Sequence, residues 1–184
     1  MKFKNTITIK LTLFIGLSLL VLGSVTYGSS KAVRFSSQRS ETIVKDTLIH
    51  PIDNNGYLGD KIASYGMEFL GTPYVTAGSS MNGFNCSGFV YFVYNHFKIQ
   101  VPRSSSQFNN FGKEIPIADV KKGDILLFLS PTRNVIGHIG IVSNPKGMNS
   151  DFIHSTSGRE MKVVITSLTK PGYTRRFVKA IRVL

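Results

Sequence analysis

The sequence predicts an α+β domain in which helices pack on a five- to six-stranded antiparallel sheet. Apolar residues recur at helical spacing over about residues 58–70, and a strongly apolar stretch follows at 86–97. Short apolar runs separated by turn signals then fill residues 125–183, which is typical of antiparallel strands. Helices that precede a meander of strands indicate the α+β class.

The first expected helix covers about residues 58–70. One of its faces carries four apolar side chains, Leu58, Ile62, Tyr65 and Phe69. Asp60 is expected in its first turn, and Gly71 follows its end. The Gly/Ser-rich segment 72–83 then predicts a loop.

The second expected helix begins at Asn85 or Cys86 and runs to about Phe97. Apolar side chains wrap most of its circumference, so we expect it to be buried on most sides. Its aromatic and β-branched content would also suit a strand. The helix is favoured by its length and by Asn85, which is a good amino-terminal cap.

Residues 99–122 predict mostly loop, because prolines and a polar run interrupt them. The strands are expected after this segment, where turn signals such as "NPKG" and "KPGY" separate the apolar runs. The expected strands lie at 125–130, 138–144, 151–157, 162–166 and 175–183.

The amino-terminal region predicts export. Residues 1–28 combine a basic start, a charge-free apolar stretch and small residues, which is the layout of a signal peptide; an uncleaved anchor is the alternative. No cysteine directly follows the apolar stretch, so lipid attachment to an amino-terminal cysteine is excluded. Residues 29–56 predict a linker, with a short extended piece at 42–49, and residues 57–184 form the expected domain. Periplasmic and fully secreted locations both remain open.

The chain is strongly basic, with a formal net charge of +12. Such a charge favours anionic partners, which include nucleic acid, membrane headgroups and acidic wall polymers. The Lys/Arg residues occur as isolated pairs, Lys121-Lys122 and Arg175-Arg176, and form no longer run that would follow a phosphate backbone. We therefore expect no nucleic-acid partner, and contact with a membrane only through the amino-terminal anchor.

Cys86 is the only cysteine of the chain. One unpaired cysteine in an exported protein suggests a reactive thiol. Its expected place at a helix start would stabilise the thiolate and lower the pKa of the thiol. Gly83 and Gly88 beside it allow tight turning and close backbone approach. The alternative is a buried structural cysteine.

A nucleophilic cysteine usually needs a base, and the base needs an orienting group. His138 and His154 fall on neighbouring expected strands, where alternation would bring both imidazoles to one side of the sheet. His50 and His96 are not well placed for this role. The alternatives are satisfied structural histidines or a zinc site. The spacing contains no close ligand pair, so no metal or cofactor is expected.

Four ordered segments resemble the NlpC/P60 cysteine peptidases. They are "GTPYVTAGSSMNGFNCSGFVYFVY" (71–94), "VPRSSSQF" (101–108), "KKGDILLF" (121–128) and "HIGIVSN" followed by "FIHSTS" (138–156). The resemblance covers about residues 57–184. It implies a papain-like α+β fold and hydrolysis of peptide bonds in peptidoglycan stem peptides, typically between the γ-carboxyl of D-glutamate and a diamino acid.

The resemblance also implies roles for single residues. Cys86 matches the nucleophile, His138 the base and His154 the polar group that orients the base. Tyr74 matches a tyrosine that lines the site and positions the substrate or its oxyanion. Ser87 matches a residue of the substrate pocket.

Asn85 departs from the family pattern, which usually has aspartate before the cysteine. That aspartate, with the tyrosine and serine matching Tyr74 and Ser87, can recognise the free amino group of a stem peptide. Asn85 lacks the charge that pairs with an ammonium group, so this preference is expected to relax. Removing a negative neighbour of Cys86 should also favour the thiolate.

Two other functions suit the same residues. One is a papain-like amidase or acyltransferase that uses the same Cys/His/His site. The other is a catalytically silent module that only binds the cell wall. The sequence does not fix the scissile bond, the diamino acid or the oligomeric state.

Overall fold

A computed structural model describes residues 54–184. Its centre is a six-stranded sheet in the order β3-β8-β4-β5-β6-β7, and all neighbouring strands pair antiparallel. The bounds are β3 (Lys113–Ile115), β4 (Ile125–Leu129), β5 (Ile136–Asn144), β6 (Asp151–Ser155), β7 (Val163–Ser167) and β8 (Phe177–Arg182). This architecture confirms the α+β class and the upper value of the expected number of strands.

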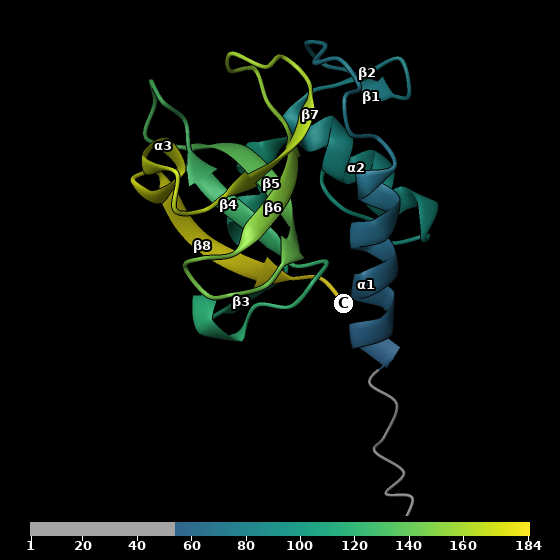
Figure 1. Cartoon of the computed structure of the whole chain (residues 1–184), viewed down its shortest axis with the longest axis vertical. Helices are drawn as coiled ribbons and strands as arrows, with labels where there is room; N and C mark the ends of the chain where they lie inside the picture. Colours follow the sequence, from purple (N-terminus) through teal and green to yellow (C-terminus); the bar gives the residue numbers. More distant parts are fainter. Residues whose placement is uncertain (1–53) are drawn as a thin grey trace, which may run out of the picture. The chain divides into compact units, whose positions relative to one another are not determined.

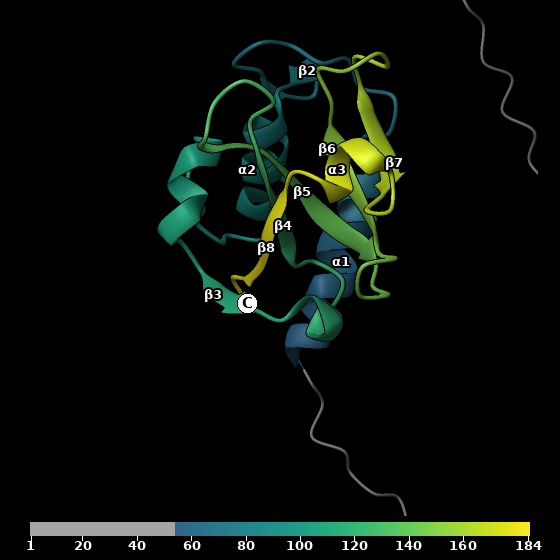
Figure 2. The same ribbon diagram turned by 90° about the vertical axis from the view of Figure 1, so that its left-hand side faces the viewer.

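Helices α1 (Asn54–Met67) and α2 (Cys86–His96) both pack against β5 and β6 on one face of the sheet. Figure 1 shows them beside the sheet, and Figure 2 shows them behind it. A short helix, α3 (Pro171–Thr174), precedes β8. Helix α2 begins at Cys86, as expected, and ends at His96, one residue before the expected end at about Phe97.

The expected bounds of the first helix, 58–70, were wrong. The helix begins at Asn54 and ends at Met67, and its first turn contains no acidic residue, so Asp60 lies beyond that turn. After Met67 the chain continues in tighter turns with hydrogen bonds between residues i and i+3. Gly71 ends them with a φ of +88°, a conformation that suits glycine.

Two segments expected as loops contain short regular elements. Residues 72–83 include most of a small hairpin made by β1 (Ser79–Ser80) and β2 (Gly83–Phe84). Residues 99–122 include edge strand β3 and two 3₁₀ turns, η1 (Ser105–Asn110) and η2 (Ile117–Asp119). Strands of two or three residues are too short to produce a detectable alternation of apolar and polar positions.

The sheet is apolar on both faces. In β4, Ile125 and Leu127 pack in the cluster beneath the two helices, whereas Leu126 and Phe128 pack in a second cluster on the opposite face. Burial on both sides explains why this strand has a continuous apolar run instead of an alternating one. Both clusters also include residues of β5 and β6, so these two strands are packed on both faces.

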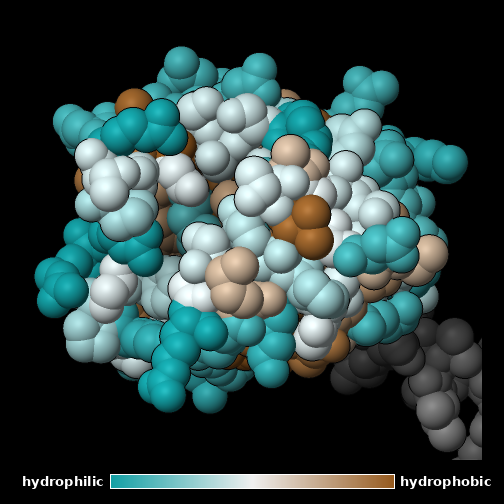
Figure 3. Space-filling view, turned by 90° about the horizontal axis from the view of Figure 1, so that it is seen from above, coloured by the Kyte–Doolittle hydropathy of each residue, from teal (hydrophilic) through white to brown (hydrophobic). Residues whose placement is uncertain are grey.

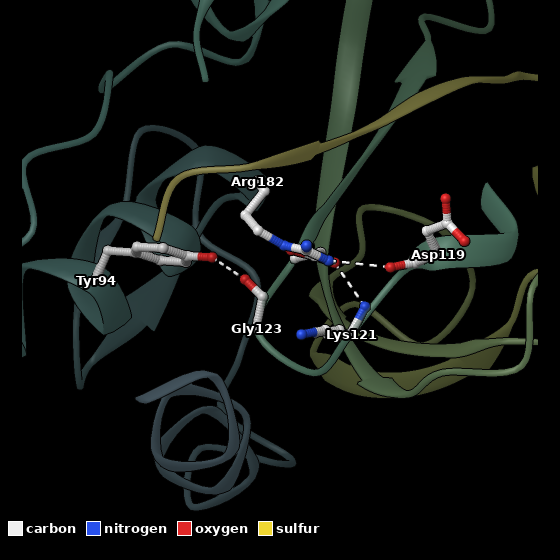
Figure 4. A network of polar contacts seen from close by, with 6 residues as sticks. Tyr94, Asp119, Lys121, Gly123 and Arg182 are labelled. Carbon is white, nitrogen blue, oxygen red and sulfur yellow. Dashed lines mark hydrogen bonds and ion pairs between the residues drawn. The ribbon is translucent and has the colours of Figure 1, made fainter. Parts of the chain in front are cut away.

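A polar network fixes the start of β4 (Figure 4). The buried carboxylate of Asp124 accepts hydrogen bonds at 2.8 and 2.7 Å from Arg182 on β8, and one at 2.6 Å from the amide of Lys121. Tyr94 of α2 donates its hydroxyl to the carbonyl of Gly123. The network connects the second helix, β4 and β8.

Several expectations lie outside the described residues. They are the leader at 1–28, almost all of the linker at 29–56, the extended piece at 42–49 and His50. Over residues 54–184, every helix is too short or too polar to cross a membrane.

Candidate active site

Cys86 occupies the first position of α2. Asn85 before it has an extended backbone, and its side chain accepts a hydrogen bond of 2.7 Å from the amide of Gly88, which caps the helix as expected. A Cβ atom on Gly88 would lie 1.9 Å from the carbonyl oxygen of Gly78. Glycine is therefore required here, because the loop crosses directly over the helix start.

The thiol of Cys86 points at β5. Its sulfur lies 3.9 Å from the carbonyl oxygen of Gly137, and the side chain is 9% exposed. Burial raises the pKa of the thiol above its usual value, although the backbone amides of Ser87 and Ile139 and the charge of Arg103 act in the opposite direction. The expected lowering of the pKa of Cys86 was therefore wrong in net sign, because desolvation outweighs the helix start.

His138 and His154 lie side by side on β5 and β6. The Nε2 atom of His138 is 3.0 Å from Nδ1 of His154, and Nε2 of His154 is 3.0 Å from the hydroxyl of Thr166 on β7. This geometry confirms that the two imidazoles share a side of the sheet. A Cβ on Gly140 would lie 2.5 Å from the ring of Phe152, so the space beside His138 is filled by β6.

Both imidazoles are held in the neutral form. Burial lowers the pKa of His138 and His154, and the positive charge of Arg176 lowers both further. His154 is fully buried, with the rings of Phe152 and Tyr173 at 4.7 and 5.1 Å. His138 keeps a partly exposed edge, so water offsets some of its desolvation.

Two cavities meet at Gly137. The first, of about 530 Å³, is called the Cys86 cleft and is lined by Tyr74, Asn85, Cys86, Ser87, Arg103 and Gly137, among others. The second, of about 340 Å³, is called the His138 pocket and is lined by Gly137, His138, Thr156, Ser157, Tyr173 and Arg176, among others. The structure thus places the nucleophile and the base expected from the sequence on adjoining cavities.

The loops that border these cavities lie at the end of the molecule that carries the β1–β2 hairpin and the β6–β7 connection (Figure 1). Figure 3 looks onto that end and shows a mostly hydrophilic surface, on which apolar side chains form separate spots. A surface of this kind suits a polar substrate better than an apolar one.

The other expected site residues also line the Cys86 cleft. Burial, and the nearby thiol of Cys86, raise the pKa of Tyr74, while a hydrogen bond with Ser157 acts in the opposite direction. The Tyr74 hydroxyl therefore keeps its proton and can donate it in a hydrogen bond. Ser87 is buried and directed to Arg103, whose Nη1 lies 3.3 Å from its hydroxyl.

Arg103 is a site residue to which the sequence analysis assigned no role. Its Nη1 donates to the side chain of Asn85 at 3.1 Å, and its Nη2 donates to the carbonyls of Ala77 and Gly78 at 2.6 and 3.2 Å. Arg103 thus ties the start of α2 to the loop before it. The available signal was a single cation beside proline in the Ser-rich segment "VPRSSSQF".

The remaining described histidine is not part of the site. The ring of His96 stacks on Tyr65 with centroids 3.9 Å apart, at the far end of α2. Within residues 54–184, no three His, Cys, Asp or Glu side chains come together as a ligand set for a metal ion.

The chain is similar to proteins of one known family. The NlpC/P60 family model matches residues 71–182. The murein DD-endopeptidase MepH of Escherichia coli is 35% identical over 123 residues, which are 64% of this chain and 43% of that protein. A γ-D-glutamyl-L-lysine dipeptidyl-peptidase of Bacillus cereus is 32% identical over 126 residues, 68% of this chain and 36% of that protein.

A solved structure shows the same fold. The crystal structure of an NlpC/P60 family protein from Bacillus cereus superposes with a TM-score of 0.61 and 31% identity. It covers 68% of this chain and 40% of the solved one. The chain therefore spans less than half the length of these relatives.

Proposed function

The chain belongs to the NlpC/P60 family, and from this premise we propose that it is an exported cysteine peptidase that hydrolyses peptide bonds in the stem peptides of bacterial peptidoglycan. The observation that carries the proposal is the arrangement of Cys86 at a capped helix start, on a cleft that adjoins the bonded His138–His154 pair. The two curated relatives are named as a murein DD-endopeptidase and a γ-D-glutamyl-L-lysine dipeptidyl-peptidase, which supports the proposal. The scissile bond that we propose is the one between γ-D-glutamate and a diamino acid.

The hydrogen bonds suggest how the proton moves. If His138 carries its proton on Nε2, it donates to Nδ1 of His154, and His154 donates from Nε2 to the hydroxyl of Thr166. Nδ1 of His138 then has a free lone pair. This nitrogen takes the proton of Cys86 while the sulfur attacks the carbonyl carbon of the substrate.

The same imidazole completes both halves of the reaction. The C–N bond breaks, the protonated His138 gives its proton to the leaving amine, and the acyl group stays on the sulfur of Cys86. His138 then takes a proton from water, whose oxygen attacks the thioester; the C–S bond breaks, the acid is released, and His138 returns the proton to the sulfur of Cys86. Because both imidazoles are neutral in the resting site, we propose that the proton moves during the attack and not before it.

In both halves of the reaction, hydrogen-bond donors must stabilise the negative charge that develops on the carbonyl oxygen of the substrate. The backbone amide of Cys86 at the start of α2 is one, and the hydroxyl of Tyr74, which keeps its proton, is a second. Asn85 and Ser87 are held by Arg103 on the acyl side of the cleft, where the peptide preceding the scissile bond would lie. This side is our proposed binding site for the stem peptide.

We further propose that the chain acts outside the cytoplasm, in the periplasm or at the cell wall, with residues 1–28 as signal peptide or anchor. The amidase or acyltransferase alternative uses the same nucleophile and differs in the bond or the acceptor. A silent wall-binding module would not need the bonded imidazole pair beside the thiol.

The test is to incubate the protein with purified peptidoglycan and, separately, with the peptide L-Ala-γ-D-Glu-diamino acid. Mass spectrometry of the products names the bond. We expect L-Ala-D-Glu and the free diamino acid from the peptide. Products cleaved only between sugar and peptide would support the amidase alternative instead.

A further inference from the structure

The His138 pocket carries a cation whose role the reaction does not explain. We propose, on the basis of the function proposed above, that this pocket receives the residue that follows the scissile bond, and that Arg176 binds a carboxylate of that residue. The ligand class is an anionic leaving residue. In this arrangement, the part of the substrate that follows the scissile bond lies in the His138 pocket, outside the Cys86 cleft.

The position of the proton donor decides which side of the substrate lies in the pocket. His138 must reach the nitrogen of the leaving amine to protonate it. His138 lines the second cavity, and this cavity meets the Cys86 cleft at Gly137, against which the sulfur of Cys86 lies. A peptide that crosses Gly137 would therefore place its acyl side near Arg103 and its leaving residue near Arg176.

The side chain of Arg176 is fixed in the wall of the pocket. Its Nε donates to the carbonyl of Gly172 at 2.8 Å, and its Nη1 donates to the carbonyl of Leu129 at 3.3 Å. Its guanidinium also lies 5.2 Å from the ring centroid of Tyr173. These contacts hold the group in one orientation and leave the hydrogens of Nη2 for a ligand.

The charge of Arg176 has no partner in the described part of the chain. The ion pairs among residues 54–184 involve other cations, and the contacts of Arg176 are with carbonyl groups and an aromatic ring. This charge has a cost, because it lowers the pKa of the base, His138. An incoming carboxylate would neutralise it and bring the pKa of His138 closer to the range useful for proton transfer.

Two carboxylates could meet this description. One is the main-chain carboxylate of a leaving residue at the end of a peptide. The other is the second carboxylate of a diamino acid such as diaminopimelate, which lysine lacks. Both are flat anions that accept charge-assisted hydrogen bonds from a guanidinium group.

The test uses three peptides that share L-Ala-γ-D-Glu before the scissile bond. The leaving residue is lysine with a free carboxylate, lysine amide, or diaminopimelate amidated at the main chain. We expect kcat/KM for one or both carboxylate peptides to exceed that for the lysine amide peptide by roughly tenfold or more. The peptide with the advantage identifies which carboxylate is bound.

Three variants separate recognition from structure. Arg176→Gln should reduce the ratio of kcat/KM between carboxylate and amide peptides to near one, and Arg176→Lys should retain part of it. The ratio is the proper readout because loss of Arg176 also changes the pKa of His138 in the free protein, from which the reaction of each of the three peptides begins. Arg175→Gln removes the same charge from an exposed neighbour that does not line the pocket, and it should behave as the wild type.

Equal rates of the wild type on all three peptides would overturn the inference and leave the proposed function standing. An unchanged ratio in Arg176→Gln would do the same. If no peptide is cleaved, the proposed function fails, and binding to the Cys86→Ala protein decides the inference. Nuclear magnetic resonance should then show that diaminopimelate binds Cys86→Ala more tightly than lysinamide does. This difference should disappear in the double variant that carries Cys86→Ala and Arg176→Gln. Equal binding of the two ligands to Cys86→Ala would refute the inference.

Discussion

The Nε2 atom of His138 lies 3.0 Å from Nδ1 of His154, and this bond fixes the ring that we propose as the base. The second nitrogen of His154 continues the chain to Thr166 on the next strand. Three adjacent strands of one sheet thus determine where the free nitrogen of His138 points.

Replacing His154 should show whether this residue acts by orienting the ring of His138. Asparagine offers an oxygen that can accept the bond from His138, whereas leucine offers none. We expect His154→Leu to lower kcat by roughly 10²-fold with little change in KM, and His154→Asn to lose clearly less. Steady-state kinetics on a stem peptide measures this. Equal losses in both variants would show that His154 does not act by orienting His138.

The reactivity of Cys86 should depend steeply on pH. Burial raises the pKa of the thiol and lowers that of His138, so the resting pair is neutral at pH 7. The thiolate fraction, and with it the rate of alkylation by iodoacetamide, should still be rising above pH 8.5, the ordinary value for cysteine. A free cysteine peptide serves as the reference. A fast plateau from pH 5 to 8 would instead indicate a preformed thiolate–imidazolium pair.

Asn85→Asp should restore a preference for substrates with a free amino terminus. The new carboxylate adds a negative charge beside Cys86, which should raise the pKa of the thiol. Both effects should be moderate. Nη1 of Arg103 lies 3.1 Å from the side-chain oxygen of Asn85, so the guanidinium would partly neutralise the new carboxylate. Rates on free and N-acetylated peptides measure the preference, and Asn85→Ser is the neutral control. An Asn85→Asp protein with unchanged thiol pKa and preference would contradict this account.

The network at the start of β4 should matter for stability. Asp124 is 1% exposed and pairs with Arg182, so Asp124→Ala would remove the carboxylate that accepts two hydrogen bonds from this guanidinium. Breaking a buried pair in this way costs about 3 kcal/mol of the free energy of unfolding. Urea denaturation measures the loss. Glu114→Ala, at an exposed pair with Lys179, should change stability by less than about 1 kcal/mol.

The sequence was sufficient for the parts of the site that regular elements position. Asn85 could be identified as a cap, so the start of α2 and the place of Cys86 followed. Strand alternation put His138 and His154 on one side, and their hydrogen bond agrees with it. Both inferences rest on local periodicity, which one sequence contains.

The remaining features depend on contacts between distant segments. Arg103 and Arg176 lie in or beside irregular segments, so no period indicates that they line the two cavities. The net pKa shift of Cys86 depends on how deeply the chain buries it, and a helix start alone predicts the opposite sign. Edge strand β3 was missed because three residues contain too little pattern.

The most direct test of the central claim is to follow Cys86 through the reaction. The protein is mixed with a stem peptide and quenched in acid within the first turnover, and its intact mass is measured. We predict an added mass equal to the acyl fragment, located on Cys86 by peptide mapping, and no peptide hydrolysis by Cys86→Ala. Hydrolysis that persists in Cys86→Ala, with no adduct in the wild type, would contradict the account.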